Sequence, residues 1–143
     1  MLLENYIKTY IKEHSYINKN TLNVFDFDLT LYKNNKWINK QVEEVKKSIN
    51  QENTITVLCT ARGIELEEET KRLLSSINLR FDKYYFNKNK ESAETYKAKV
   101  FQEILNKNKQ ITKVNFWDDR PENIEEVRSL VNVYSITYNG YLI

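Results

Sequence analysis

Four aspartates stand in two pairs, and each pair follows an apolar segment of the sequence. The segment TLNVFDF finishes at Asp26 and Asp28, and TKVNFW finishes at Asp118 and Asp119. Carboxylates that are brought together repel one another unless a cation or a proton offsets their charge. Because neither pair includes a histidine or a cysteine, the ligands are oxygens only, which favours a hard ion such as Mg²⁺, and Mg²⁺ suits phosphate chemistry. The two pairs therefore predict a Mg²⁺ site.

Two further segments could complete such a site. Thr60 and Arg62 lie in CTARG, directly after the apolar run TITVLC. A lysine is expected to screen the charge of a phosphate, and the candidates are Lys97 and Lys99. If this segment is helical, Lys97 shares a face with the apolar Val100, whereas Lys99 lies about 200° around the helix, towards water. We therefore predict that Lys97 points at the buried anions.

The rest of the sequence predicts a fold that can bring these distant segments together. Apolar runs typical of strands alternate with stretches whose apolar residues recur every three or four positions, as on one face of a helix. Strands that alternate with helices form a mostly parallel sheet with helices on both faces. Ligands bind such a sheet outside the carboxyl ends of its strands, where the candidate residues stand. We expect an α/β fold with one doubly wound sheet.

The expected elements follow from the same patterns, and no repeat or break in composition divides them, so we expect a single domain over residues 1–143. A polar turn is expected over residues 31–37, and an apolar stripe predicts an N-terminal helix over residues 1–18, packed on the core. Pro121 is expected in the first turn of a helix, where its missing N–H is not needed. The expected strands are 21–27, 54–59, 81–86, 112–117 and 133–137, and the other expected helices are 38–49, 66–77 and 92–107.

Composition narrows the class of protein further. The 143 residues carry 22 basic and 20 acidic side chains, a net charge of +2 that neither demands nor excludes a polyanionic partner. Cys59, the single cysteine, excludes an internal disulfide, suits a reducing compartment and is expected in the core. The charged start predicts no signal peptide, and no apolar stretch reaches the roughly 20 residues of a membrane span. We expect a soluble, cytoplasmic protein without a membrane partner.

The order of the candidate residues resembles the four motifs of the haloacid dehalogenase (HAD) superfamily. The sequence D-F-D-L-T is followed by a threonine, then a lysine, then D-D, from about residue 22 to residue 137. A receiver domain of a response regulator has similar parts, but its lysine comes last, whereas here the lysine precedes D-D. Within the superfamily, FDFDLTLY, CTAR, TYK and WDDRPEN resemble RNA-repair-like HAD domains and the 3′-phosphatase domain of polynucleotide kinases.

The resemblance implies an active phosphatase and a role for each residue. Asp26 would attack phosphorus and form an aspartyl-phosphate, and Asp28 would move a proton to the leaving oxygen and from water. Thr60 would hold a phosphate oxygen, and Lys97 would neutralise the nucleophile and the transferring group. Mg²⁺ would lie between Asp26, the main-chain carbonyl of Asp28, and one or both of Asp118 and Asp119.

Some neighbouring residues leave alternatives open. Arg62 and Arg120 could bind further phosphate oxygens, although Arg120 could equally pair with a nearby carboxylate. Tyr32 and Trp37 flank the turn after the nucleophile, where a base could stack, but packing is the favoured interpretation. The sequence also departs from the family pattern at two positions: Leu29 replaces a frequent glycine, and Asn123 stands where the RNA-repair-like group tends to carry histidine.

Expectations about the substrate rest on what the chain lacks. Larger HAD phosphatases carry cap domains after the first motif or between the second and third, and both intervals here are used by core elements. An uncapped site is open to a large substrate, so we expect a phosphorylated polynucleotide end, such as a 3′-phosphate. A phosphoprotein or small-nucleotide phosphatase is the alternative within the enzyme class. A non-catalytic HAD-fold binding module is the alternative of a different class.

Overall fold

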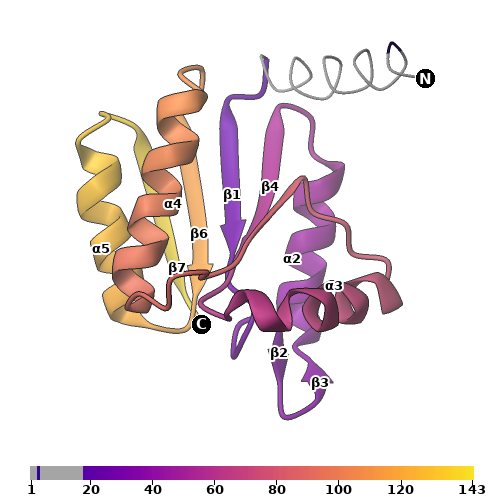
Figure 1. Cartoon of the computed structure of the whole chain (residues 1–143). Coiled ribbons are helices and arrows are strands. Elements are labelled where there is room, and N and C mark those ends of the chain that lie inside the picture. The colour runs from indigo at the N-terminus through magenta and orange to yellow at the C-terminus, as the bar shows by residue number, and fades with distance from the viewer. Residues whose placement is uncertain (1–2, 4–17) are drawn as a thin grey trace.

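The protein is built on a central sheet of five parallel strands. The computed structural model describes residues 3 and 18–143. The strands lie in the order β5-β4-β1-β6-β7, and every neighbouring pair is parallel. Figure 1 shows β4, β1, β6 and β7 side by side. The predicted α/β fold with one doubly wound sheet is therefore confirmed. The strand bounds are β1 (Thr21–Phe25), β4 (Thr54–Cys59), β5 (Lys83–Tyr85), β6 (Lys113–Asp118) and β7 (Thr137–Leu142).

Helices pack on both faces of the sheet, because successive side chains of each strand point to opposite faces. On one face, Val24 and Val57 pack with the apolar stripes of α4 (Ala93–Lys107) and α5 (Pro121–Asn132). On the other face, Phe25 and Leu58 pack with α2 (Asn39–Asn50) and α3 (Glu67–Ser76), which a short 3₁₀ turn, η1 (Ile64–Leu66), precedes. Cys59 is fully buried in the first of these two cores, as predicted.

The order of the strands places β1 beside β6 at the centre of the sheet. From β1 the chain builds outward through β4 to β5, and α4 then carries it back across the sheet to β6, on the other side of β1. The strand order reverses between β1 and β6, which is where open α/β sheets bind their ligands. Asp26 follows β1 and Asp118 ends β6, so the topology brings the two pairs of aspartates together.

The segment after β1 forms a small hairpin in place of a cap domain. Strands β2 (Tyr32–Lys33) and β3 (Lys36–Trp37) pair antiparallel. Asn34 and Asn35 between them both have positive φ, as a tight hairpin turn requires and asparagine tolerates. Tyr32 and Trp37 pack against Phe27 and against each other, so the packing interpretation is confirmed. Between Asp26 and Lys113 the chain forms only this hairpin and core elements, which confirms that no sizeable cap is present.

Two predicted elements, the fifth strand and the N-terminal helix, are not confirmed by the structure. The fifth strand was predicted at 133–137, and that prediction is wrong: residues 133–136 form the turn after α5, and β7 begins only at Thr137. Tyr134 and Ile136 raised the strand signal because they are apolar, but they pack against the core from a turn. The N-terminal helix predicted over residues 1–18 lies almost wholly outside the described residues.

A buried row of polar side chains crosses the face of the sheet beneath α2. Asn23 donates to Ser48 Oγ of α2 at 2.9 Å and accepts from Asn115 Nδ2 at 2.8 Å. Asn139 Nδ2 continues the row by donating to Asn115 Oδ1 at 3.0 Å, and Ser48 lies 2.6 Å from Thr56 Oγ1. Because buried polar groups are costly without partners, this paired row, which begins beneath α2 and extends to β6 and β7, helps to fix the register of the strands.

Candidate active site

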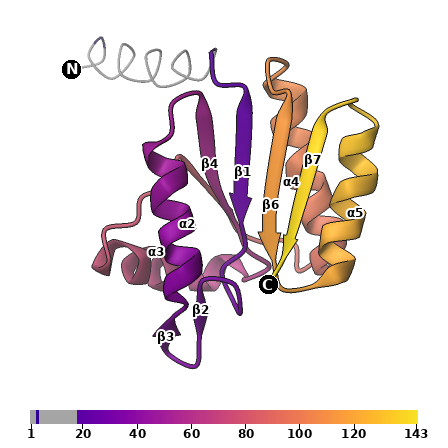
Figure 2. The same cartoon turned by 180° about the vertical axis from the view of Figure 1, so that it is seen from behind.

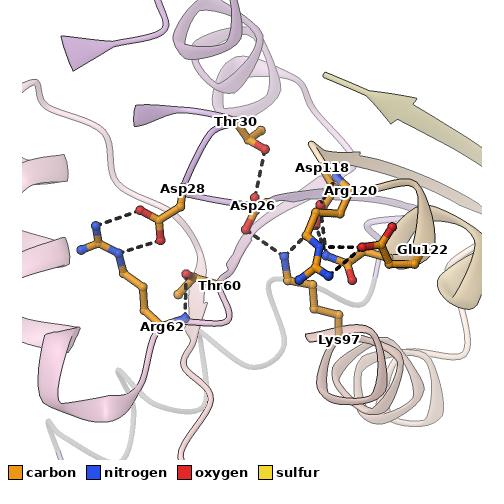
Figure 3. Close-up of polar contacts among 10 residues, drawn as sticks. Asp26, Asp28, Thr30, Thr60, Arg62, Lys97, Asp118, Arg120 and Glu122 are labelled. Carbon is orange, nitrogen blue, oxygen red and sulfur yellow. Dashed lines mark hydrogen bonds and ion pairs between the residues drawn. The ribbon is translucent and has the colours of Figure 1, made fainter. Parts of the chain in front are cut away.

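The predicted residues meet at the carboxyl ends of β1, β4 and β6, around a cleft of about 190 Å³. Asp26 lies at its centre, with Asp28 and Arg62 on one side and Lys97 and Asp118 on the other (Figure 3). The fold therefore brings residues that are far apart in the sequence into one cluster of charges.

Lys97 is the central contact of the cluster. Its Nζ donates to Asp26 Oδ1 at 2.8 Å and to Asp118 Oδ2 at 2.6 Å, and only 2% of the Lys97 side chain is exposed. Lys97 lies on the buried face of α4, as its helical position predicted, while the exposed Lys99 pairs with Glu91. Burying an ammonium without partners is costly in free energy. The two carboxylates therefore stabilise the buried charge of Lys97.

Asp26 is held at both of its carboxylate oxygens. Lys97 contacts Oδ1, and the hydroxyl of Thr30 donates to Oδ2 at 3.0 Å. Burial, together with the nearby charge of Asp118, raises the pKa of Asp26 to about 7, although Lys97 acts in the opposite direction. Lys97 in turn has its pKa raised by Asp26 and Asp118 against the opposing effect of burial. The metal-free site thus has more negative charge than its one ammonium offsets.

Asp118 and Asp119 differ in what their carboxylates contact. Asp118 is fully buried, and its oxygens accept from Lys97 Nζ, from the backbone N–H of Arg120 at 2.9 Å, and from the side-chain amide of Asn123 at 3.1 and 3.2 Å. Asp119 lines the cleft instead. Asp26, Asp118 and Asp119 each offer an oxygen within 4.8 Å of the others, a set of hard ligands that fits a divalent cation.

Thr60 and Asp28 complete the opposite side of the site. Thr60 is fully buried after β4, and its Oγ1 accepts from the backbone N–H of Arg62 at 3.1 Å. Asp28 is half-exposed, and the guanidinium of Arg62 donates two hydrogen bonds of 2.9 Å to its carboxylate. The side chain of Asp28 therefore faces Arg62 and is not among the three clustered carboxylates. A metal contact through its main-chain carbonyl stays a prediction.

The two arginines contact carboxylates of the chain in this structure. Arg62 is fixed by Asp28, by Thr70 Oγ1 at 3.1 Å, and by the ring of Phe27, whose centroid lies 4.6 Å from the guanidinium. The exposed guanidinium of Arg120 pairs with Glu122 at 2.7 Å. Phosphate binding by either side chain would therefore have to compete with an existing ion pair.

Two contributions to the site were missed by sequence reasoning. Thr30 holds the nucleophile candidate, and its position four residues after Asp26 in D-F-D-L-T was the available signal. Asn123 was noted only as a departure from a histidine pattern, yet its amide donates to both oxygens of Asp118. The carbonyl oxygen of the same amide is buried and has no partner among the described residues, so a water or a ligand in the cleft would be needed to satisfy it.

This arrangement defines an HAD-type site on a doubly wound sheet. The chain belongs to HAD domain family 1 of Swiss Army Knife RNA repair proteins, and the match extends over residues 7–140. Among solved structures it is similar to a chain of the Pnkp1/Rnl/Hen1 RNA repair complex, with a TM-score of 0.69 and 16% sequence identity. That match covers 86% of this chain but only 43% of the other, so this chain spans less than half the length of its structural neighbour.

Two other comparisons bear on the predictions. No protein of curated function matches the chain in sequence. Among the helices of the described residues, none has both the length and the hydropathy that crossing a membrane requires.

The structure predicts that two neighbouring lysines differ sharply in their effect. Lys97→Met removes the ammonium between Asp26 and Asp118 and should lower the rate roughly 100- to 1,000-fold, the scale of one preorganised electrostatic group. Lys99→Met removes only a surface pair with Glu91 and should change the rate little. Turnover of an aryl phosphate at matched Mg²⁺ measures both, with circular dichroism as the control for folding. A larger loss in the Lys99 variant would contradict the assignment.

The raised pKa of Asp26 predicts how stability depends on pH. Its value is 3.8 in the unfolded chain and about 7 in the native, metal-free protein. The native state therefore binds more protons between these values, and the free energy of unfolding falls as pH rises from about 4 to about 7. Asp26→Asn should remove this loss, so the variant should gain stability over wild type across that window. Urea denaturation in chelator measures the difference, and a difference that is constant with pH would contradict the prediction.

Proposed function

We propose that this chain is a Mg²⁺-dependent phosphatase that hydrolyses phosphomonoesters through phosphoryl transfer to Asp26. The observation that carries the proposal is the buried ammonium of Lys97 between Asp26 and Asp118, at 2.8 and 2.6 Å. With Asp119 beside them, three carboxylates face one ammonium, so full ionisation of the three leaves an excess of two negative charges. A divalent cation matches that excess, and a site of this kind attracts a phosphate only when the cation is bound.

The contacts of the aspartates suggest which of them hold the ion. Asp118 is fully buried and is not among the residues that line the cleft, so we assign it to positioning Lys97. Asp26 and Asp119 line the cleft and would hold Mg²⁺ with the main-chain carbonyl of Asp28. The ion, when bound, supplies positive charge to the equatorial oxygens of the transferring phosphoryl group.

The covalent chemistry would then proceed in two steps. An oxygen of Asp26 forms a bond to phosphorus while the ester bond breaks, and Asp28 gives its proton to the leaving oxygen. Asp28 next takes a proton from water, whose oxygen attacks phosphorus and displaces Asp26 as a free carboxylate. Lys97 and Thr30 keep the carboxylate of Asp26 oriented through both steps.

Thr60 would act on the phosphate, and Arg62 would act on Asp28. Because the hydroxyl oxygen of Thr60 accepts from the Arg62 N–H, its own proton can be directed at a phosphate oxygen. The bidentate contact of Arg62 with Asp28 favours a second role, in which Arg62 positions the proton carrier. Arg120, exposed at the rim of the cleft, is the weaker candidate for binding phosphate because Glu122 occupies it.

For the substrate we propose the phosphorylated end of a nucleic acid, such as a 3′-phosphate. Two observations support it: the chain belongs to a family of RNA repair proteins, and the described residues form no cap domain over the site. A polynucleotide end is too large for an enclosed pocket, whereas an open cleft at the edge of a sheet admits it.

A panel of substrates tests the proposal. Wild-type protein with Mg²⁺ should release phosphate from 3′-phosphorylated oligonucleotides faster than from phosphopeptides or free nucleotides. Asp26→Asn, which keeps the shape but loses the attacking charge, should be slower by several orders of magnitude. Preference for phosphopeptides would favour a phosphoprotein phosphatase, and no turnover of any member would favour a non-catalytic module. Full activity in chelator would contradict the role of the metal.

The two roles for Arg62 predict different dependence on the leaving group. If Arg62 positions Asp28, Arg62→Ala should slow hydrolysis of a sugar phosphate by roughly 10- to 100-fold, part of the usual contribution of a general acid. An aryl phosphate, whose leaving oxygen needs less protonation, should be affected much less. If Arg62 instead binds phosphate, Arg62→Ala should lower kcat/KM by a similar factor for both substrates, mainly by raising KM. Arg128→Ala, which removes an exposed arginine on α5, is the control.

A further inference from the structure

Among the described residues, no helix packs against half of one face of the sheet. Figure 2 shows α2 on this side, beside β4, whereas none of the described helices lies in front of β6 and β7. A groove of about 690 Å³ runs between α2 and β7 at this place, and its lining includes Lys40, Trp117, Tyr141 and Ile143. The groove lies at the carboxyl ends of the strands, the same edge of the sheet as the active site.

Aromatic rings form a stack across this face. The rings of Phe25 and Trp117 are parallel within 8°, with centroids 4.2 Å apart, and those of Trp117 and Tyr141 are parallel within 17° at 4.8 Å. The three residues are neighbours in register on β1, β6 and β7. Because β7 pairs only with β6 among the described strands, the stack ends at Tyr141, which is 43% exposed. Another flat ring could extend it.

The remaining lining suits a nucleotide better than a purely apolar ligand. Lys40 supplies a positive charge from the first turn of α2, Gln41 supplies an amide, and Glu44 supplies one carboxylate. A second groove, of about 720 Å³, is lined by Glu67, Glu91 and Glu103 together with Lys88 and Lys99, which leaves its lining with a net negative charge. In the groove beside Tyr141 the charges of Lys40 and Glu44 balance, so it is the better match for a phosphate backbone.

The groove is joined to the catalytic residues through the backbone. Trp117 directly precedes Asp118, and the N–H of Ile143 donates to the carbonyl of Asp118 at 2.9 Å. Strand β7 lies two strands from β1, about 10 Å at the usual spacing. A strand whose phosphorylated end reaches Asp26 could therefore place a nearby nucleotide in the groove.

We propose that this groove binds an unpaired nucleotide next to the phosphorylated end of the substrate, with its base stacked on Tyr141. Aromatic side chains on open sheet faces stack bases in this way in single-strand-binding proteins. The inference rests on the proposed function and deepens it, because it specifies a single-stranded end as the substrate.

The test compares kcat/KM for a short 3′-phosphorylated single-stranded oligoribonucleotide with that for a nucleoside 3′-monophosphate. In wild type the ratio of the two should exceed one. Tyr141→Ala should lower the ratio roughly 5- to 100-fold, the loss expected from one stacked base, and mainly through KM for the oligonucleotide. Tyr141→Phe keeps the ring and should restore most of the ratio.

Two further variants keep the test decisive. Tyr134→Ala removes a tyrosine at the amino end of β7, where its hydroxyl bonds Asn106, and should leave the ratio unchanged. Tyr141→Leu retains an apolar side chain and should lower the ratio even if Tyr141→Ala does not fold.

The outcomes separate this inference from the proposed function. If the wild-type protein hydrolyses both substrates and the Tyr141 variants change the ratio by less than twofold, the proposed role of the groove is wrong. The proposed function would still stand. If those variants instead change the mass in sedimentation, the groove is an interface between copies of the chain, and the inference is equally wrong. A wild-type protein that hydrolyses neither substrate would overturn the proposed function itself.

Discussion

The buried ammonium of Lys97 is the interaction on which the rest of this site depends. Asp26 and Asp118 end adjacent strands and would repel each other if nothing lay between them. Lys97 bridges them from α4, the helix that carries the chain back across the sheet. The crossover therefore both sets the strand order and delivers the one positive charge that allows the carboxylates to stay buried. Removing the ammonium would leave two buried carboxylates without an offsetting charge, which is why the cluster behaves as a unit.

The backbone beside this cluster shows a second constraint. Leu29 has φ 62°, in the left-handed region that favours glycine, which accounts for the frequent glycine at this position in the family. The turn is held by main-chain hydrogen bonds, with Leu29 N–H to Tyr32 O at 2.9 Å and Leu31 N–H to Phe27 O at 2.9 Å. A non-glycine residue there costs on the order of 1 kcal/mol. The tight turn between the nucleophile and the β2–β3 hairpin is thus kept at some expense of stability.

Much of the fold and the heart of the site could be predicted from the sequence. The strand signal of residues 54–59 was clear because β4 is buried along its whole length and reads as an apolar run. The signal of residues 112–117 was clear because Val114 and Phe116 are apolar and fully buried. Lys97 could be separated from Lys99 because a helix fixes which positions share a face. Edge strand β7 was misplaced because its sequence, TYNGYL, contains residues that disfavour strands, whereas the turn before it is apolar.

What could not be predicted are contacts that depend on the positions of side chains from separate elements. The pairing of Arg62 with Asp28 joins two loops, and that of Asn123 with Asp118 joins α5 to the end of β6. No periodicity in the sequence encodes either distance. The open face beside Trp117 and Tyr141 was likewise hidden, because a strand covered by a helix and one left bare have similar sequences. These contacts bear on substrate and on proton transfer, so they decide how the common fold is used here.

Trapping the covalent intermediate tests the central claim most directly. Wild-type protein would be mixed with Mg²⁺ and a phosphate-labelled substrate, quenched in acid within one turnover, and treated with borohydride, which reduces an acyl phosphate to an alcohol. Peptide mass spectrometry should find the reduced residue at Asp26, in amounts that depend on Mg²⁺ and on Lys97. Reduction at another carboxylate, or rapid turnover without any reduced residue, would contradict the account.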